Sequence, residues 1–147
     1  MADIRQVTPV EAKEVLESGS DAVYLDVRTV EEFSAGHPEG ALNVPIIFFG
    51  ERGPTSNPDF LAVVEKSIPR ERTILCGCKS GGRSASAARA LKAAGYESVI
   101  NVKGGFSGAK DSGGNPAVAG WAESGLPVGT GEPPGANYGE LKERAGG

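Results

Sequence analysis

Apolar residues recur at helical spacing in several segments of the chain, and short continuous apolar runs separate those segments. The first helical segment opens at Thr8-Pro9-Val10-Glu11, where a capping threonine, a first-turn proline and a capping-box glutamate occur together. We predict that this helix runs to Glu17 or Ser18 and that Gly19 ends it. Further helices are predicted over residues 30–35, from Asn57-Pro58-Asp59 to about residue 66, and over the alanine-rich residues 84–94, with Gly95 as a C-terminal cap.

Extended segments alternate with these helices. Strands are predicted over residues 23–25, 41–44, 73–76 and 98–102. This alternation is typical of an α/β fold, in which a central, mostly parallel sheet carries helices on both faces. Ligands of such sheets bind beyond the carboxyl ends of the strands. Asp26 and the glycine-rich loop that begins at Gly77 each follow a predicted strand, so we expect both at that edge.

Composition and charge narrow the choice of partners. Of the 147 residues, 39% are hydrophobic and 23% are charged, which is typical of a soluble globular domain. The net charge of −4 argues against nucleic acid as a main partner. No apolar run approaches the roughly 20 residues that cross a bilayer, and residues 1–5 lack the layout of a signal peptide. We therefore expect a cytoplasmic protein without a nucleic-acid or membrane partner.

The chain has two cysteines, Cys76 and Cys78, separated by one residue. A disulfide between them would be strained and would close no useful loop. Together with the single histidine, His37, they supply at most three of the four ligands that a structural zinc site needs. A site completed by a carboxylate stays open, but the spacing gives it no support, and we expect no metal and no cofactor. The better interpretation is a reactive thiol beside a glycine-rich turn.

The segment Cys78-Lys79-Ser80-Gly81-Gly82-Arg83-Ser84 links a predicted strand to the start of a predicted helix. Its glycines allow a tight turn whose N–H groups point inward, and those groups, with the helix dipole, form an anion site. Lys79 and Arg83 add two positive charges. A cysteine at the start of such a cradle has its thiolate stabilised. A nucleophile is then available near neutral pH without a general base.

This loop resembles the active-site loop of the rhodanese (sulfurtransferase) family, which begins with cysteine and ends with arginine, with four residues between them. The resemblance covers about residues 4–128. Its other landmarks, in chain order, are Leu25-Asp26-Val27-Arg28 with Glu32-Phe33, then Gly36-His37, Gly40-Ala41 and Asn43-Val44-Pro45, then Gly104-Gly105-Phe106, and finally Trp121 with Gly125-Leu126-Pro127. Two departures stand out. Proline is shifted by one position within residues 36–41, and residues 106–120 form an insertion that either closes over the site or lies on the surface.

The resemblance implies a single domain over residues 1–128, followed by a tail, residues 129–147. Within the tail, the sequence of residues 138–144 predicts a short helix that either packs on the domain or frays. It implies that Cys78 carries a persulfide. The sulfur comes from thiosulfate or another small anionic donor and passes to cyanide, a thiol or a protein cysteine. Arg83 joins Cys78 in catalysis. The substrate-binding residues are expected at Lys79, Ser80, Gly81, Gly82 and Ser84.

Other side chains near these landmarks have simpler interpretations. Cys76 ends an apolar strand and is expected to be a buried structural thiol. Asp26, Arg28 and Glu32 are expected to form a structural ion-pair set, with Asp26 and Arg28 in a supporting role; the alternative is that Asp26 orients Arg83 or the loop. The chemistry needs no base, so His37 is expected to face solvent or to cap a turn. Trp121 is expected to pack in the core or under a lid.

Three rival functions stay open from the sequence. A cysteine phosphatase, including arsenate-reductase-type relatives, needs five residues between cysteine and arginine; Cys78 gives four and Cys76 gives six. A regulatory docking module keeps the fold without catalysis, but such a module does not need the cysteine. A sulfur-relay protein would form the persulfide and turn over thiosulfate slowly. The oligomeric state is left open.

Overall fold

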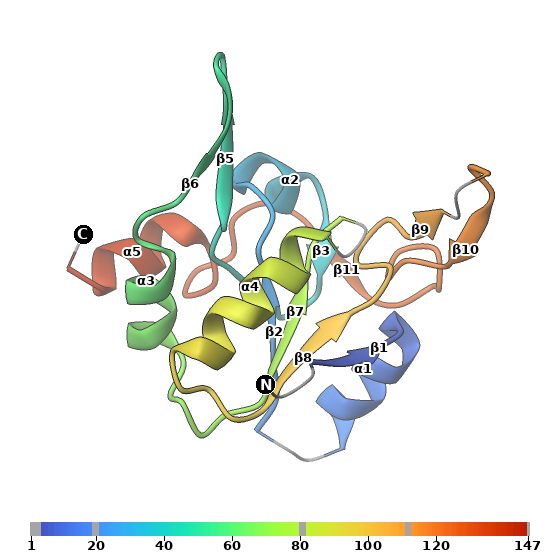
Figure 1. The fold of residues 1–147 in the computed structure, drawn as a ribbon, viewed down its shortest axis with the longest axis horizontal. Helices are drawn as coiled ribbons and strands as arrows, with labels where there is room; N and C mark the ends of the chain where they lie inside the picture. Colours follow the sequence, from blue (N-terminus) through green and yellow to red (C-terminus); the bar gives the residue numbers. More distant parts are fainter. Residues whose placement is uncertain (1–3, 19–20, 80–81, 111–112, 147) are drawn as a thin grey trace.

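The computed structural model describes residues 4–18, 21–79, 82–110 and 113–146. Its centre is a five-stranded sheet in which every pairing is parallel. The strand order is β1 (Arg5–Val7), β8 (Val99–Val102), β7 (Ile74–Gly77), β2 (Val23–Asp26) and β4 (Leu42–Asn43). The register places Asp26 opposite Gly77, so two predicted site segments leave the sheet at one edge (Figure 1). The predicted α/β fold is confirmed.

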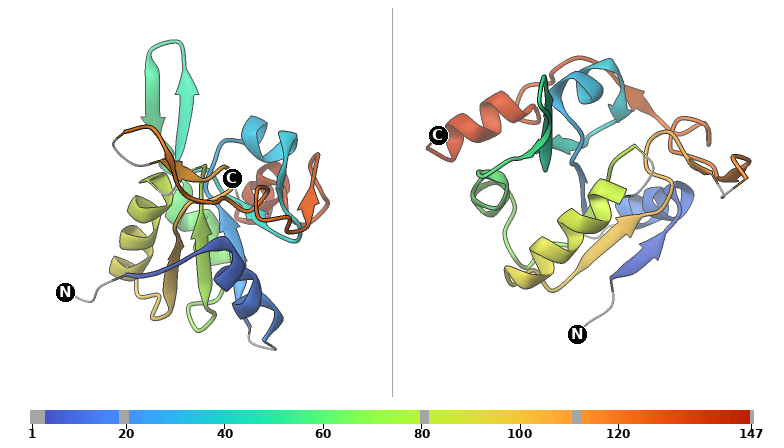
Figure 2. Two further views of the ribbon diagram at one scale, coloured as in Figure 1. Left: turned by 90° about the vertical axis from the view of Figure 1, so that its right-hand side faces the viewer. Right: turned by 45° about the horizontal axis from the view of Figure 1, so that its top comes forward.

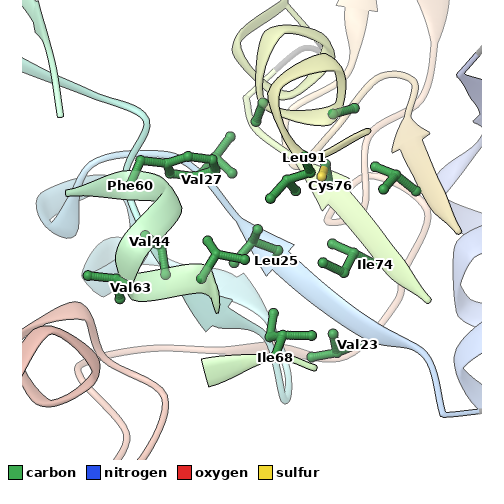
Figure 3. Packing of buried hydrophobic residues seen from close by; sticks show 14 of the residues in the cluster. Val23, Leu25, Val27, Val44, Phe60, Val63, Ile68, Ile74, Cys76 and Leu91 are labelled. Carbon is green, nitrogen blue, oxygen red and sulfur yellow. The ribbon is translucent and has the colours of Figure 1, made fainter. Parts of the chain in front are cut away.

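Helices cover both faces of the sheet. On one face lie α3 (Phe60–Ser67), α4 (Gly82–Ala93) and α5 (Tyr138–Arg144), and on the other lie α1 (Pro9–Glu17) and α2 (Val30–Ala35). Strand residues alternate between the two cores, as the pleat requires. Leu25 and Cys76 face α3 and α4 (Figure 3), whereas Tyr24 and Leu75 face the core that contains Trp121.

Most local signals in the sequence mark the element ends correctly. Thr8 and Glu11 form the predicted capping box at the start of α1. Gly95 takes a φ of +104° after α4, the left-handed conformation that a glycine cap supplies. Gly19 lies outside the described residues. The predicted start of α3 at Asn57-Pro58 is wrong, because the helix begins at Phe60.

The Asn57 side chain is used elsewhere, which explains the later start of α3. Its Oδ1 accepts a hydrogen bond from the Asp59 amide at 3.0 Å, an Asx turn rather than a helix cap. Its Nδ2 donates to the Pro45 carbonyl at 2.8 Å and to the Tyr138 hydroxyl at 3.0 Å. The side chain thus joins the loop after β4 to α5. Tyr138 and Leu141 of α5 are buried in the same core, so the expected C-terminal helix packs against the domain.

Three strand pairs were not predicted. They are the hairpin of β5 (Ile47–Gly50) and β6 (Gly53–Ser56), the pair of β3 (His37–Pro38) and β11 (Val128–Gly129), and the hairpin of β9 (Ala109–Lys110) and β10 (Pro116–Val118). The β5–β6 hairpin projects from the body of the molecule in Figure 1 and in the left view of Figure 2. The β9–β10 hairpin lies within the insertion and extends to one side. None of the helices in the described ranges is long and apolar enough to cross a membrane.

Candidate active site

The main chain at Cys78 is fixed by a neighbouring turn. The Phe106 amide donates a hydrogen bond to the Cys78 carbonyl at 2.8 Å, and the Ser107 amide donates to the Lys79 carbonyl at 2.8 Å. Gly105 makes this contact possible. A Cβ atom there would lie 2.2 Å from the Cys78 carbonyl oxygen, and its φ is +49°. Gly105 therefore allows the two main chains to approach each other.

The Cys78 side chain lies at the base of the loop, between the sheet and α4, and the residue is 2% exposed. The sequence indicates a more open thiol, because its neighbours in the chain are poor core formers. The burial means that only a slim group, such as a terminal sulfur atom, can approach it. Ser80 and Gly81, two predicted binding residues, lie outside the described residues. Cys76 is fully buried, and this burial raises the pKa of its thiol far above the ordinary value, as expected of a structural cysteine.

Arg83 is held by a carboxylate that the sequence did not pair with it. Its two terminal nitrogens donate to the two carboxylate oxygens of Glu32 at 2.7 and 2.9 Å. The Phe49 ring lies 5.4 Å from the guanidinium carbon. Glu32 itself accepts from the amide and hydroxyl of Thr29 at 3.1 Å each, in the capping box of α2. The arginine is thus fixed between α2 and the β5–β6 hairpin.

The electrostatics of this pair follow from those contacts. Burial alone would raise the pKa of Glu32, but the hydrogen bonds from Arg83 and from the Thr29 amide outweigh it and lower the pKa to about 2. The same hydrogen bond to Glu32 raises the pKa of Arg83. Both groups are therefore ionised over the physiological pH range.

The alternative that Asp26 orients Arg83 is wrong, because Asp26 pairs with Arg28. The Arg28 Nη2 atom donates to Asp26 Oδ2 at 2.7 Å and to the Gly36 carbonyl at 2.6 Å, and all of these groups are buried. The Arg28 guanidinium carbon lies 4.5 Å from the centre of the Phe106 ring. Phe106 in turn donates its amide to Cys78. The expected ion pair therefore supports the loop indirectly, through this ring.

The remaining predicted loop residues differ in exposure. Ser84 is fully buried, and its hydroxyl donates a hydrogen bond to Asn101 Oδ1 at 2.5 Å. The hydroxyl hydrogen is therefore used inside the protein. Gly82 is the exposed first residue of α4. Lys79 is exposed, and it lines a cavity of about 250 Å³ together with Glu32 and Phe106. A larger cavity of about 570 Å³ is lined by Arg83 on one side and by Phe60 and Leu61 of α3 on the other.

His37 and Trp121 are both structural. His37 is buried, so the expectation that it faces solvent is wrong. It stacks on Phe33 at 3.8 Å between ring centres and bonds through Nδ1 to the Phe33 carbonyl at 2.6 Å, so it caps the last turn of α2. Trp121 is buried in the core and donates its Nε1 hydrogen to the Pro127 carbonyl at 2.7 Å. Within the described ranges, no group of three His, Cys, Asp or Glu side chains could hold a metal ion.

Sequence reasoning missed two contacts of the site. The Glu32–Arg83 pair joins residues far apart in the sequence, and no local signal shows which cation a carboxylate faces. The position of Phe49 depends on the β5–β6 hairpin, which was not predicted. A cue for that hairpin is present in the continuous run of β-favouring residues before Gly50 and in the glycine at position 53.

Comparison with known proteins gives consistent matches. A family model described as "Rhodanese-like domain" matches residues 8–112. "Thiosulfate sulfurtransferase 16, chloroplastic" of Arabidopsis thaliana is 44% identical over 105 residues, which cover 71% of this chain and 78% of that protein. "Protein HIGH ARSENIC CONTENT 1, mitochondrial", also of Arabidopsis thaliana, is 40% identical over 76% of this chain and 64% of its own length, so the match spans slightly less than two thirds of it.

Among solved structures, the crystal structure of Rv0390 from M. tuberculosis superposes with a TM-score of 0.72. It is 33% identical in sequence, and the match covers 88% of this chain and all of that one. The order of strands and the position of the loop between β7 and α4 thus belong to a fold already seen in experiment.

Proposed function

Because the chain belongs to the rhodanese-like domain family, we propose that it is a sulfurtransferase in which Cys78 carries a sulfane sulfur between a donor and an acceptor. Relatives named as thiosulfate sulfurtransferases, at 44% and 42% identity, support this class of activity. The observation that carries the proposal is the position of Cys78. It directly follows the end of β7, at the start of the loop to α4, on a main chain that Phe106 and Ser107 hold in place.

In the first half-reaction, the Cys78 thiolate attacks the outer sulfur of the donor. With thiosulfate, the new bond joins Sγ to that sulfur, the sulfur–sulfur bond of the donor breaks, and sulfite leaves with the bonding electron pair. Charge is conserved, because a thiolate and a dianion become a persulfide anion and sulfite. We expect the N–H groups at the start of α4 to favour the negative sulfur, as helix N-termini do for anions in general.

In the second half-reaction, an acceptor attacks the outer sulfur of the persulfide. Cyanide takes it as thiocyanate and restores the Cys78 thiolate, and a thiolate acceptor takes it as a new persulfide. This is a covalent, two-step exchange of the ping-pong type. Arg83 stays fixed by Glu32 throughout, so its contribution is a preformed positive group beside the loop.

The test is intact-mass measurement after exposure to thiosulfate and then to cyanide. We expect one added sulfur that cyanide removes. Cys78→Ser should acquire no sulfur, whereas Cys76→Ala, the matched control at the buried second cysteine, should acquire it normally.

Other results would assign a rival function. Release of phosphate from an aryl phosphate without a sulfur adduct indicates a phosphatase. No response to either compound indicates a docking module. An adduct that forms readily while thiosulfate turnover stays slow indicates a sulfur relay.

A further inference from the structure

A cavity of about 280 Å³ lies at the amino ends of β2 and β7. Its wall includes Val23, the first residue of β2, and Arg72, which precedes β7 by two residues. Cys78 follows the opposite end of β7, which is 4 residues long, and such a strand spans roughly 13 Å. The cavity is therefore a separate place from the candidate active site.

An apolar wall closes one side of this cavity. It is formed by Leu16 of α1 and by Trp121 and Pro127 of the C-terminal segment. The volume is just below the range of about 300–1,000 Å³ that is usual for pockets of drug-sized ligands. The cavity therefore suits a small metabolite, of about ten non-hydrogen atoms.

Two opposite charges on the wall are left without a partner. Arg72 and Glu39 both line the cavity, and neither belongs to an ion pair among the described residues. The Arg72 Nε atom donates to the Asp21 carbonyl at 2.8 Å, which anchors the guanidinium and leaves its terminal nitrogens for a ligand. Lys13 and Glu17, which also line the cavity, pair with each other at 3.4 Å. The wall thus offers one cation and one carboxylate.

A ligand with one charge of each sign complements both groups. Its carboxylate accepts hydrogen bonds from the terminal nitrogens of Arg72, and its ammonium donates to Glu39. A simple anion would bring its charge near Glu39 without compensation, and a simple amine would do the same near Arg72. An α-amino acid carries both charges at one end, and its side chain can contact the apolar wall.

Two contacts connect this cavity to the main chain at Cys78. Tyr24 also lines the cavity, and its hydroxyl end lies against Gly77, where a Cβ atom would be 1.8 Å from the Tyr24 oxygen. The Trp121 amide donates to the Gly105 carbonyl at 2.8 Å, and Gly105 packs against the Cys78 carbonyl. The rings of Tyr24 and Trp121 meet edge to face, with 5.5 Å between their centres. A molecule that contacts these two rings therefore acts on both segments beside Cys78.

We propose that this cavity binds a small zwitterion of the α-amino-acid class, and that the bound molecule speeds sulfur uptake at Cys78 by holding Tyr24 and Trp121 in place. The second part rests on the proposed function. The first part does not, because binding can be measured without any sulfur transfer.

Trp121 is the only tryptophan of the chain, so its fluorescence reports binding at the cavity directly. We expect L-leucine to change this fluorescence saturably, with a Kd of about 1 mM or lower, the scale for a ligand of about ten non-hydrogen atoms. 4-Methylpentanoate lacks the ammonium and 3-methylbutylamine lacks the carboxylate, and each should bind at least about tenfold more weakly. Equal binding of leucine and either analogue, or no saturable change, overturns the proposal.

Substitutions on the wall test the two charges separately. Arg72→Gln should weaken leucine binding by about tenfold, and Arg72→Lys, which keeps the charge, should weaken it less. Glu39→Gln should weaken the binding of leucine but not that of 4-methylpentanoate. Arg52→Gln, at an exposed arginine of the β5–β6 turn outside the cavity, is the matched control. If it weakens leucine binding as much as Arg72→Gln does, the cavity is not the binding site.

The rate of persulfide formation from thiosulfate tests the action on Cys78. Saturating L-leucine should raise this rate by about fivefold, whereas 4-methylpentanoate at the same concentration should not. Arg72→Gln should need about tenfold more leucine for the same effect. A rate that leucine leaves unchanged overturns the coupling to Cys78. If thiosulfate leaves no sulfur on Cys78 with or without leucine, the proposed function fails, and the fluorescence titration still decides whether the cavity is a binding site.

Discussion

Replacing Glu32 by glutamine removes one negative charge from the centre of the site and keeps the shape of the side chain. Glutamine still accepts a hydrogen bond from the Thr29 amide, because capping boxes use Glu or Gln at this position. The variant therefore isolates the ion pair with Arg83 from the end of α2. Glu31→Gln is the matched control, since it removes the same charge from an exposed neighbour on the same helix.

The structure sets the size and the sign of the effect. A fall in the pKa of Glu32 from 4.5 to about 2 corresponds to about 3 kcal/mol of free energy of unfolding. The side chains of Arg83 and Glu32 are 18% and 27% exposed, so solvent screens part of the attraction, and about 1–2 kcal/mol is the expected value. Because the folded protein depresses this pKa, the stabilisation is fully present above about pH 4.5 and is lost as the pH falls toward about 2.

Urea unfolding, followed by circular dichroism between pH 7 and pH 3, measures this difference. At neutral pH, Glu32→Gln should unfold at lower urea than both the wild type and Glu31→Gln, with an unchanged slope. Below about pH 4.5 the gap to the wild type should narrow. If the two variants behave alike at every pH, the pair contributes nothing to stability and the lowered pKa is not real.

Two further substitutions test the packing of the site. Gly105→Ala places a methyl group against the Cys78 carbonyl, so it should lower the free energy of unfolding by at least about 3 kcal/mol and abolish persulfide formation. Gly114→Ala is the control, at φ +83° with nothing within 4 Å, and should lower the free energy of unfolding by about 1 kcal/mol. Equal losses in urea unfolding would show that only the backbone angle matters. The Tyr24 hydroxyl is buried without a partner among the described residues, so Tyr24→Phe should change the free energy of unfolding by less than about 1 kcal/mol, in the stabilising direction. A marked loss of stability would reveal a partner for this hydroxyl.

Local signals in the sequence determine much of the architecture. The start of α1 follows from Thr8 and Glu11, because a capping box satisfies its backbone donors within four residues. The parallel sheet follows from the alternation of strands with helices, since parallel strands need a crossover between them. Placing Asp26 and the Cys78 loop at one edge then requires only the rule that the strands end together. These features depend on short stretches of chain, and so they can be predicted.

The contacts that define the site depend on longer distances. Arg83 and Glu32 are far apart in the sequence, and the sequence suggested Asp26 rather than Glu32 as a partner for Arg83. Asn57 is a residue type that favours helix caps, but its side-chain amide donates hydrogen bonds to Pro45 and Tyr138 instead. The helix therefore starts later. The capping preference of Asn57 is worth about 1 kcal/mol, and its contacts across the fold override it.

The burial of Cys78 and the pairing of the arginines have a common consequence for catalysis. A guanidinium already bonded to a carboxylate does not need to reorganise when a donor arrives, and the loop carbonyls held by Phe106 and Ser107 do not move either. Cys78 is only 2% exposed, so few waters compete with a sulfur atom that reaches it. The cost is a weaker net charge at the entrance, which reduces attraction for small dianions.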